Sequence, residues 1–173
     1  PGKLAYASAG SGSTNHLSAE LFQRAAGIEM LHVPYKGGAP AVLDTVANQT
    51  QVFFSAGTQT LPHVKAGKLT LLAVTEPKRT GLLPGVPAVA ETLPGYNMSV
   101  WYGAYGPAGM PREIVMRLNA EIAKALAVPD VRARMDAMGV EVVSSSPEQL
   151  ATTLRQDFER FGKIIKDLKI KLD

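Results

Sequence analysis

The chain has 173 residues, of which 46% are hydrophobic and 19% charged, so it can bury a core and is not a disordered polypeptide. Its net charge of +3, with no block of like charges, does not favour nucleic acid as a partner. The absence of cysteine excludes disulfides and thiolate metal sites. The sequence has no apolar run long enough to span a bilayer, and it begins with Pro1 without a basic-then-apolar leader, which is typical of a processed or truncated piece.

A short strand, a glycine-serine loop and a helix are predicted in succession near the N-terminus. Residues 4–8 alternate apolar and small side chains, and apolar residues at helical spacing predict a helix that begins at Ser13 or Thr14. The first N–H groups of a helix lack partners inside it and carry about half a positive charge, and glycine lets an anion approach them. The stretch therefore predicts an anion-binding loop, whose candidate contacts are Ser8, Gly10, Ser11, Gly12, Ser13, Thr14 and His16.

The loop by itself has limited specificity as a motif. No Gly-Lys-Ser/Thr sequence follows it, and Asn15 stands in the place of the third glycine of a dinucleotide fingerprint. A small anion such as a carboxylate is therefore favoured over a nucleotide. An equally weighted interpretation of these residues is that Ser13 or Thr14 only caps the helix, while Gly10 and Gly12 only turn the chain.

Strands and helices alternate through the first half of the chain, which predicts an α/β fold with a mostly parallel sheet. The segment LTLLAV is almost uniformly apolar, as expected of a strand that is covered on both faces. The predicted strands are 4–8, 30–33, 51–55 and 69–74, and the predicted helices after the first are 39–47 and a short helix that ends at Gly67.

The second half begins with a proline- and glycine-rich connection over 75–96, in which at most a short helix around 88–92 is expected. The last helix has the clearest start signal in the chain, because Ser146-Pro147-Glu148-Gln149 is a capping box with proline at the first helical position. The other predicted elements are strands at 98–105 and 140–143 and helices from Pro111 and over 130–138.

Candidate catalytic groups are few. The only histidines are His16, His32 and His63, and their spacing does not suggest a metal site. His32 is interpreted as a core residue of a strand, and His16 as packing against the loop, with ligand contact as its alternative. An enzyme alternative is a hydrolase that uses Ser11 or Ser13 with His16, although the Gly-x-Ser-x-Gly elbow is absent. Binding without chemistry is the favoured interpretation, and no cofactor or metal is expected.

The order of several segments resembles one family. AYASAGSGSTNHLSAELFQRAAG is followed by HVPYKGGAPAVLDTV, VKAGKLTLLAVT, LPGVPAVAETLPGY, WYGAYGPAGMP and PDVRARMDAMGVE. This succession covers essentially the whole chain and is similar to the Bug family, the substrate-binding proteins of tripartite tricarboxylate transporters. The resemblance implies a periplasmic protein of type II-like binding-protein architecture, in which two α/β lobes close on a small organic carboxylate. It also implies delivery of that carboxylate to a membrane permease, without chemistry.

The resemblance also implies roles for particular residues. The loop at 8–14 corresponds to a carboxylate-binding loop of the second lobe. The PYKGG segment makes Tyr35, Lys36 and Gly37 second-choice contacts, with a plain strand-to-helix turn as an equally weighted alternative. Ser55 and Trp101 are weaker candidates, and Trp101 is more often a core or hinge residue.

The resemblance further implies a division of the chain. Residues 1–97 are assigned to the second lobe without its first elements, and 98–173 to a crossing strand and the C-terminal helical part of an incomplete first lobe. A whole family member is expected to carry a signal peptide and a further carboxylate loop ahead of Pro1. Asn48 stands where the family usually has glycine, a mild change because asparagine tolerates the left-handed conformation, and Gln51 where aspartate is common.

Two further expectations follow from a missing leading segment. Apolar stripes on the helices that begin near Pro111 and Ser146 would lie uncovered in the single chain. The helices are then expected to pack on each other, on another copy of the chain or on a separate chain that supplies the missing segment, and self-association is the favoured interpretation. A non-transport interaction or sensing module is the remaining alternative to a transport function.

Overall fold

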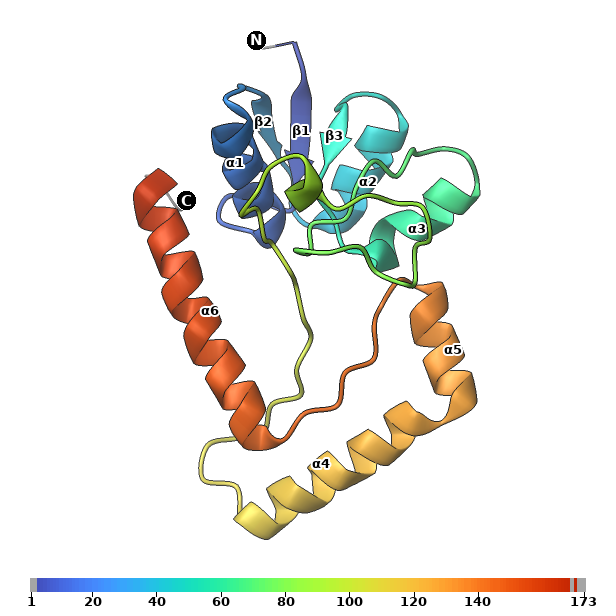
Figure 1. The fold of residues 1–173 in the computed structure, drawn as a ribbon, viewed down its shortest axis with the longest axis vertical. Helices are drawn as coiled ribbons and strands as arrows, with labels where there is room; N and C mark the ends of the chain where they lie inside the picture. Colours follow the sequence, from blue (N-terminus) through green and yellow to red (C-terminus); the bar gives the residue numbers. More distant parts are fainter. Residues whose placement is uncertain (1–2, 169, 171–173) are drawn as a thin grey trace.

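The N-terminal half of the protein is an α/β body built on a parallel sheet. The structure is a computed structural model that describes residues 3–168 and 170. The elements of the body are β1 (Ala5–Ser8), α1 (Thr14–Ala26), β2 (Leu31–Pro34), α2 (Gly38–Val46), β3 (Val52–Phe53) and α3 (Gly57–Lys65). The strands lie in the order β2-β1-β3 and both pairs are parallel (Figure 1), which confirms the predicted fold class.

Local chemistry fixes both ends of α1, as predicted. Ser13 is the N-cap residue, and its hydroxyl accepts the His16 N–H at 3.4 Å. Gly27 closes the helix in the left-handed conformation, with φ of 65°. Asn48, after α2, also has a positive φ of 58°, which confirms that it adopts the conformation expected of the glycine it replaces.

The apolar segment 69–74 is not a strand, so that prediction was wrong. Only Val74 has ladder contacts: its N–H donates to the Pro87 carbonyl at 2.9 Å, and its carbonyl accepts the Val89 N–H at 3.0 Å. A strand needs an extended neighbour along its whole length, and within the described residues this segment has one only at Val74. Leu72 is consequently 70% exposed instead of covered on both faces.

The connection after this segment contains the short turn that was expected, the 3-10 helix η1 (Val89–Glu91). The Glu91 carboxylate accepts the Ala88 N–H at 2.8 Å and makes two hydrogen bonds with the Arg79 guanidinium, at 2.8 and 2.7 Å. The hydrogen bond from Arg79, followed by that from Ala88, lowers the pKa of Glu91 to about 2.

We expect Glu91→Gln to destabilise the folded chain at neutral pH but not in strong acid. The folded pKa of Glu91 lies below its ordinary value of 4.5, so the ionised carboxylate stabilises the fold above pH 4.5. That stabilisation shrinks as the pH falls from 4.5 towards 2. The effect is small, because the Arg79 and Glu91 side chains are 53% and 43% exposed. Urea unfolding at pH 7 and near pH 2 measures it, with the exposed Glu141→Gln as the control; a difference equally large at both pH values contradicts the prediction.

The C-terminal half forms an outer frame of helices, α4 (Arg112–Ala127), α5 (Pro129–Ala137) and α6 (Pro147–Leu168). Helix α6 runs beside α1, and α4 lies at the end of the molecule away from the sheet (Figure 1). The capping box predicted for α6 is confirmed, since the Gln149 N–H donates to Ser146 Oγ at 3.2 Å and Gln149 Oε1 accepts the Ser146 N–H at 2.9 Å. Among the helices of residues 3–168, none combines the length and apolar composition needed to cross a membrane.

Two segments that join the frame to the body are extended but are not strands, contrary to prediction. In 98–105, sheet-like bonding stops after the Met98 N–H, which donates to the Thr75 carbonyl at 2.9 Å. In 140–143, Val143 is 74% exposed. The described part of the chain gives neither segment a paired strand as neighbour, and apolar side chains alone do not create one.

The main core lies where α6 meets α1 and the segment that leads to residue 98. Leu17, Tyr96 and Met98 are buried there, and the Tyr96 hydroxyl donates to the Ser18 carbonyl at 3.0 Å. The C-terminal part of α6 therefore packs on the N-terminal body. The division into lobes at residue 97 stays a prediction, as does a hinge over 98–105. The half-buried residues around this core are Leu21, Phe22, Phe54, Val89, Leu93, Phe161, Ile164, Ile165 and Ile170.

Trp101 connects the segment 98–105 to α6 through a hydrogen bond. Its indole N–H donates to Asp157 Oδ2 at 2.6 Å, while Arg160 contacts Asp157 Oδ1 at 2.9 Å and the Asn97 carbonyl at 3.2 Å. The Asp157 and Arg160 side chains are only 18% and 28% exposed, so solvent screens these contacts little.

We expect Asp157→Ala to lower the free energy of unfolding and to expose the indole. Loss of a hydrogen bond to a charged group costs about 1.5–3 kcal/mol. Trp101 is the only tryptophan, so intrinsic fluorescence reports this segment alone, and its emission should move to longer wavelength. Asp167→Ala, on the exposed end of the same helix, is the matched control. Unchanged emission in Asp157→Ala would show that Asp157 does not hold the segment.

Candidate functional site

The glycine-serine loop turns sharply at the carboxyl end of β1. Gly10 and Gly12 have φ of 127° and 77°, conformations that other residues rarely adopt. Ser13 closes the turn by donating to the Gly10 carbonyl through its hydroxyl at 2.7 Å and its N–H at 3.2 Å. A Cβ on Gly10 would lie 3.5 Å from the Tyr35 carbonyl, so this turn lies against the loop that follows β2.

Three loops meet at the carboxyl edge of the sheet: 9–13 after β1, 35–37 after β2 and 54–56 after β3. The Gly37 N–H donates to the Ala9 carbonyl at 3.2 Å, and the Asn15 side-chain amide donates to the Phe54 carbonyl at 2.5 Å. This edge faces the side of the body on which α4 lies (Figure 1). Ligand sites of open α/β sheets form at such an edge, and the predicted contacts from Ser8 to Ser55 gather there.

The three helices that begin at this edge share one electrostatic feature. α1, α2 and α3 have no acidic residue in the first turn, whereas α4, α5 and α6 each have one, at Glu113, Asp130 and Glu148. An acidic first-turn residue would offset the partial positive charge of a helix N-terminus. At the sheet edge that charge is left for an anion.

The predicted residues of the first loop divide into two groups. The Gly10 N–H donates to Ser8 Oγ at 3.2 Å and the Gly12 N–H to His16 Nδ1 at 3.0 Å, so these donors point into the protein. Within the described residues, the N–H groups of Ser11 and Thr14 have no hydrogen-bond partner. Among the predicted contact residues of this loop, the backbone donors that remain for a ligand are therefore those of Ser11 and Thr14.

The second-choice residues and the weaker candidate Ser55 lie at the same edge, whereas the weaker candidate Trp101 does not. Partial burial, and then the Asp44 carboxylate of α2, raise the pKa of Tyr35. Lys36 is exposed, and Ser55 Oγ donates to Gln59 Oε1 at 3.1 Å. The indole of Trp101 is instead bonded to α6.

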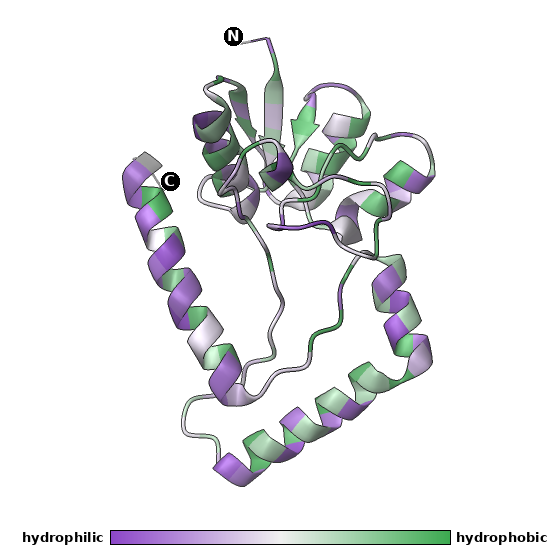
Figure 2. Ribbon diagram, viewed as in Figure 1, coloured by the Kyte–Doolittle hydropathy of each residue, from purple (hydrophilic) through white to green (hydrophobic). Residues whose placement is uncertain are grey.

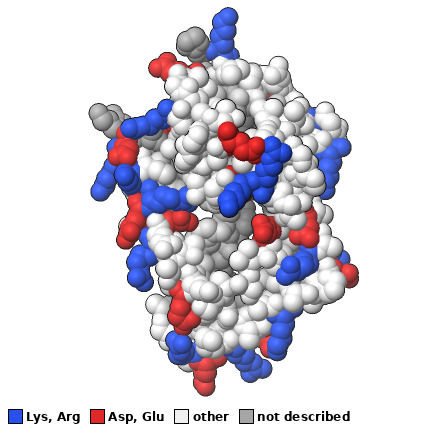
Figure 3. Space-filling view, viewed as in Figure 1, with Lys and Arg blue, Asp and Glu red and all other residues white. Residues whose placement is uncertain are grey.

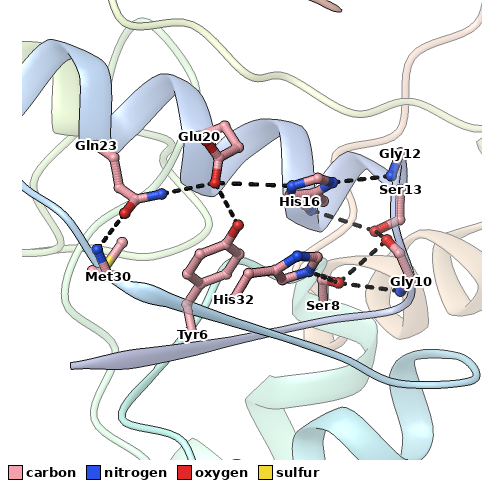
Figure 4. Close-up of polar contacts among 10 residues, drawn as sticks. All are labelled: Tyr6, Ser8, Gly10, Gly12, Ser13, His16, Glu20, Gln23, Met30 and His32. Atoms are coloured by element: carbon pink, nitrogen blue, oxygen red, sulfur yellow. Dashed lines mark hydrogen bonds and ion pairs between the residues drawn. The ribbon is translucent and has the colours of Figure 1, made fainter. Parts of the chain in front are cut away.

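A stack of three rings, from Tyr6, His16 and His32, lies beside the loop, between α1 and the sheet (Figure 4). Tyr6 and His16 are buried, and His32 is half-buried. The ring centroids of His16 and His32 are 4.1 Å apart with 10° between planes, and those of Tyr6 and His32 are 4.8 Å apart with 11°. The Tyr6 hydroxyl donates to Glu20 Oε1 at 2.6 Å. Burial, and then the Glu20 carboxylate, raise the pKa of Tyr6 well above its ordinary value.

The geometry of the loop does not support the alternative that the protein is a hydrolase. The Ser13 hydroxyl donates to a backbone carbonyl, and His16 Nδ1 accepts a backbone N–H, so they are not arranged as nucleophile and base. Ser8 Oγ and His32 Nε2 lie 2.7 Å apart, a suitable distance, but Ser8 is 0% exposed and out of a substrate's reach.

Two open hollows on the surface are poorer candidates than the sheet edge. One of about 490 Å³ at the start of α6 is lined in part by Glu148. The other, of about 520 Å³, is lined in part by Glu20, Glu29 and Asp167. In the second hollow these three carboxylates outnumber the one guanidinium, that of Arg24, and in the first the charge is that of Glu148, so both hollows disfavour an anionic ligand. Elsewhere, basic and acidic side chains are interspersed over the face shown in Figure 3, without a large patch of one sign.

Gln51 lies away from the candidate site. Its side chain accepts the Ala5 N–H at 2.9 Å and donates to the Asn48 carbonyl at 3.3 Å, at the amino end of β1. Its replacement of the aspartate common in the family therefore affects the opposite edge of the sheet.

The fold is that of the periplasmic solute-binding receptors. The chain matches the tripartite tricarboxylate transporter family receptor over residues 1–170 and belongs to that family, which includes the Bug proteins. The resemblance seen in the sequence is thus confirmed, together with the periplasmic-binding-protein architecture. Members of the family are solute-binding receptors and periplasmic binding proteins.

Individual relatives show how much of a family member the chain represents. It is 40% identical over 172 residues to the UPF0065 protein in the tcbD-tcbE intergenic region of Pseudomonas sp. (strain P51), covering 98% of this chain and 51% of that protein. A solved structure of R. palustris Rpa4515 with adipate has a TM-score of 0.92 and 33% identity, covering 100% of this chain and 58% of that one. MatC (Rpa3494) from Rhodopseudomonas palustris with bound malate has a TM-score of 0.81 and 29% identity, covering 95% and 57%. The chain thus spans about half the length of the curated relative.

Proposed function

We propose that this chain is the part of a periplasmic receptor that holds one carboxylate of a small organic acid at the edge formed by loops 9–13, 35–37 and 54–56. The observation that carries the proposal is the convergence of three helix N-termini without a first-turn acid on one sheet edge. Two solved relatives, one with adipate and one with bound malate, favour a dicarboxylate. The receptor then delivers the acid to the membrane permease of a tripartite transporter, without a chemical step.

Each predicted residue has a distinct role in this proposal. Ser11 and Thr14 supply the backbone donors to the carboxylate, with their hydroxyls beside them, and exposed Lys36 adds a positive charge. Gly10 and Gly12 give the loop its shape through their positive φ. Tyr35, Gly37 and Ser55 line the neighbouring loops, while Ser8, Ser13 and His16 hold the first loop from inside.

A titration of the ¹⁵N-labelled chain with adipate tests the proposal. We expect saturable amide shifts at Ser11, Thr14 and Lys36, because charge-assisted hydrogen bonds form there. Adipamide, of the same length but neutral, is the control ligand and should leave these amides unchanged. Equal shifts with both ligands, or shifts confined to the outer helices, would contradict binding at this edge.

A further inference from the structure

The contact between Gly12 and His16 places a titratable ring inside the candidate site. The Gly12 N–H donates to His16 Nδ1 at 3.0 Å, and His16 is only 8% exposed. An imidazole nitrogen accepts a hydrogen bond only while it carries no proton. The loop conformation seen here therefore requires His16 with Nδ1 unprotonated.

The groups around His16 favour one tautomer of the neutral ring. On the same helix, Glu20 Oε1 lies 3.8 Å from His16 Nε2, which favours a proton on that nitrogen. From β1, the Tyr6 ring lies 6.3 Å away, and its hydroxyl donates to the same Glu20 oxygen (Figure 4). From β2, His32 stacks on His16 at 4.1 Å, so a charge on one ring opposes a charge on the other.

We propose that His16 is a positioning residue whose neutral Nε2–H form holds Gly12, and that protonation of His16 releases the loop and weakens carboxylate binding. A proton on Nδ1 would face the Gly12 N–H directly, so the peptide must turn away. Gly12 can do so, because glycine has the widest choice of backbone conformations. Ser11, one residue earlier, would move with it. The effect on the ligand rests on the proposed function, whereas the effect on the loop does not.

Two variants of His16 with amide side chains distinguish the roles of its two ring nitrogens. Asparagine places an oxygen near the position of Nδ1 and does not titrate, whereas glutamine reaches the position of Nε2 instead. In the ligand-free chain, we expect the Gly12 amide resonance to titrate together with the His16 ring, to be pH-independent in His16→Asn, and to be displaced at every pH in His16→Gln. His63→Gln, on α3, should leave the titration unchanged. A Gly12 amide that does not follow the His16 ring overturns the proposal.

Adipate titrations at pH 8 and 5.5 test the consequence for binding. Adipate itself takes up protons in this range, which affects both proteins equally. The measured quantity is therefore the dissociation constant of the parent divided by that of His16→Asn. We expect this ratio to rise about tenfold at the lower pH. A constant ratio overturns the link to binding. If adipate binds to none of the proteins at either pH, the proposed function fails, and the Gly12 titration still decides the positioning role of His16.

Discussion

Gly12→Val is expected to abolish adipate binding at the loop. Gly12 has φ of 77°, and a residue with a Cβ in the left-handed conformation costs about 1–2 kcal/mol. A β-branched side chain relieves that strain by rotating the backbone, which breaks the Gly12–His16 contact and moves Ser11. In an NMR titration, the Ser11 and Thr14 amides should show no saturable shift at adipate concentrations that saturate the parent, at least a tenfold loss of affinity.

Gly67→Val is the matched control for this variant. Gly67 has a similar φ of 68° and follows α3, and a Cβ added there would have no neighbouring atom within 4 Å. The substitution therefore introduces similar backbone strain away from the three loops. We expect adipate shifts to be retained in Gly67→Val. Retained binding in Gly12→Val contradicts a role for the loop, and loss in both variants points to unfolding.

The first helix and its loop could be predicted because their signals are local. A serine N-cap, apolar residues at helical spacing and a glycine stop determine α1 without help from distant residues. The segments 69–74, 98–105 and 140–143 could not be predicted in the same way. Their apolar residues are compatible with strands, but a strand also needs a paired neighbour, which the sequence of the segment does not contain.

The candidate site, like the fold, could be predicted from the sequence only in part. Its loops could be brought together from the sequence, because the carboxyl ends of parallel strands share an edge. The ring stack was missed, since it depends on the register that sets Tyr6 opposite His32. That two aromatic rings lie at paired positions of β1 and β2 is the signal that could have revealed it. The inward direction of the Gly10 and Gly12 N–H groups depends on the same packing.

We expect the 173-residue chain to self-associate through the apolar faces of α4 and α6. Both helices carry bands of apolar and polar residues along their length (Figure 2). Phe158 is 79% exposed, so α4 and α6 do not cover each other. Burying apolar surface gains about 25 cal/mol per Å², which favours contact with a second copy. The other exposed apolar residues of these helices are Ile114, Met116, Leu118, Ile122 and Leu154.

Light scattering over a range of concentrations measures this association. The average mass should rise with concentration in the parent, and Phe158→Glu combined with Leu154→Glu should return the chain to a monomer. Leu72→Glu is the control, because Leu72 is 70% exposed but belongs to the connection at 69–74 in the N-terminal body. An equal fall in mass for both proteins would show that the α4 and α6 faces are not the contact.

The monomeric Phe158→Glu, Leu154→Glu chain then tests how much of the carboxylate site these residues contain. If the proposed edge is one side of a two-sided site, water reaches the other side of the bound anion and competes for its oxygens. Adipate should then bind with a dissociation constant of about 1 mM or weaker, in keeping with one or two charge-assisted hydrogen bonds. A micromolar or tighter constant for this monomer would mean that the 173-residue chain holds the acid without a second side, and that the division at residue 97 is wrong.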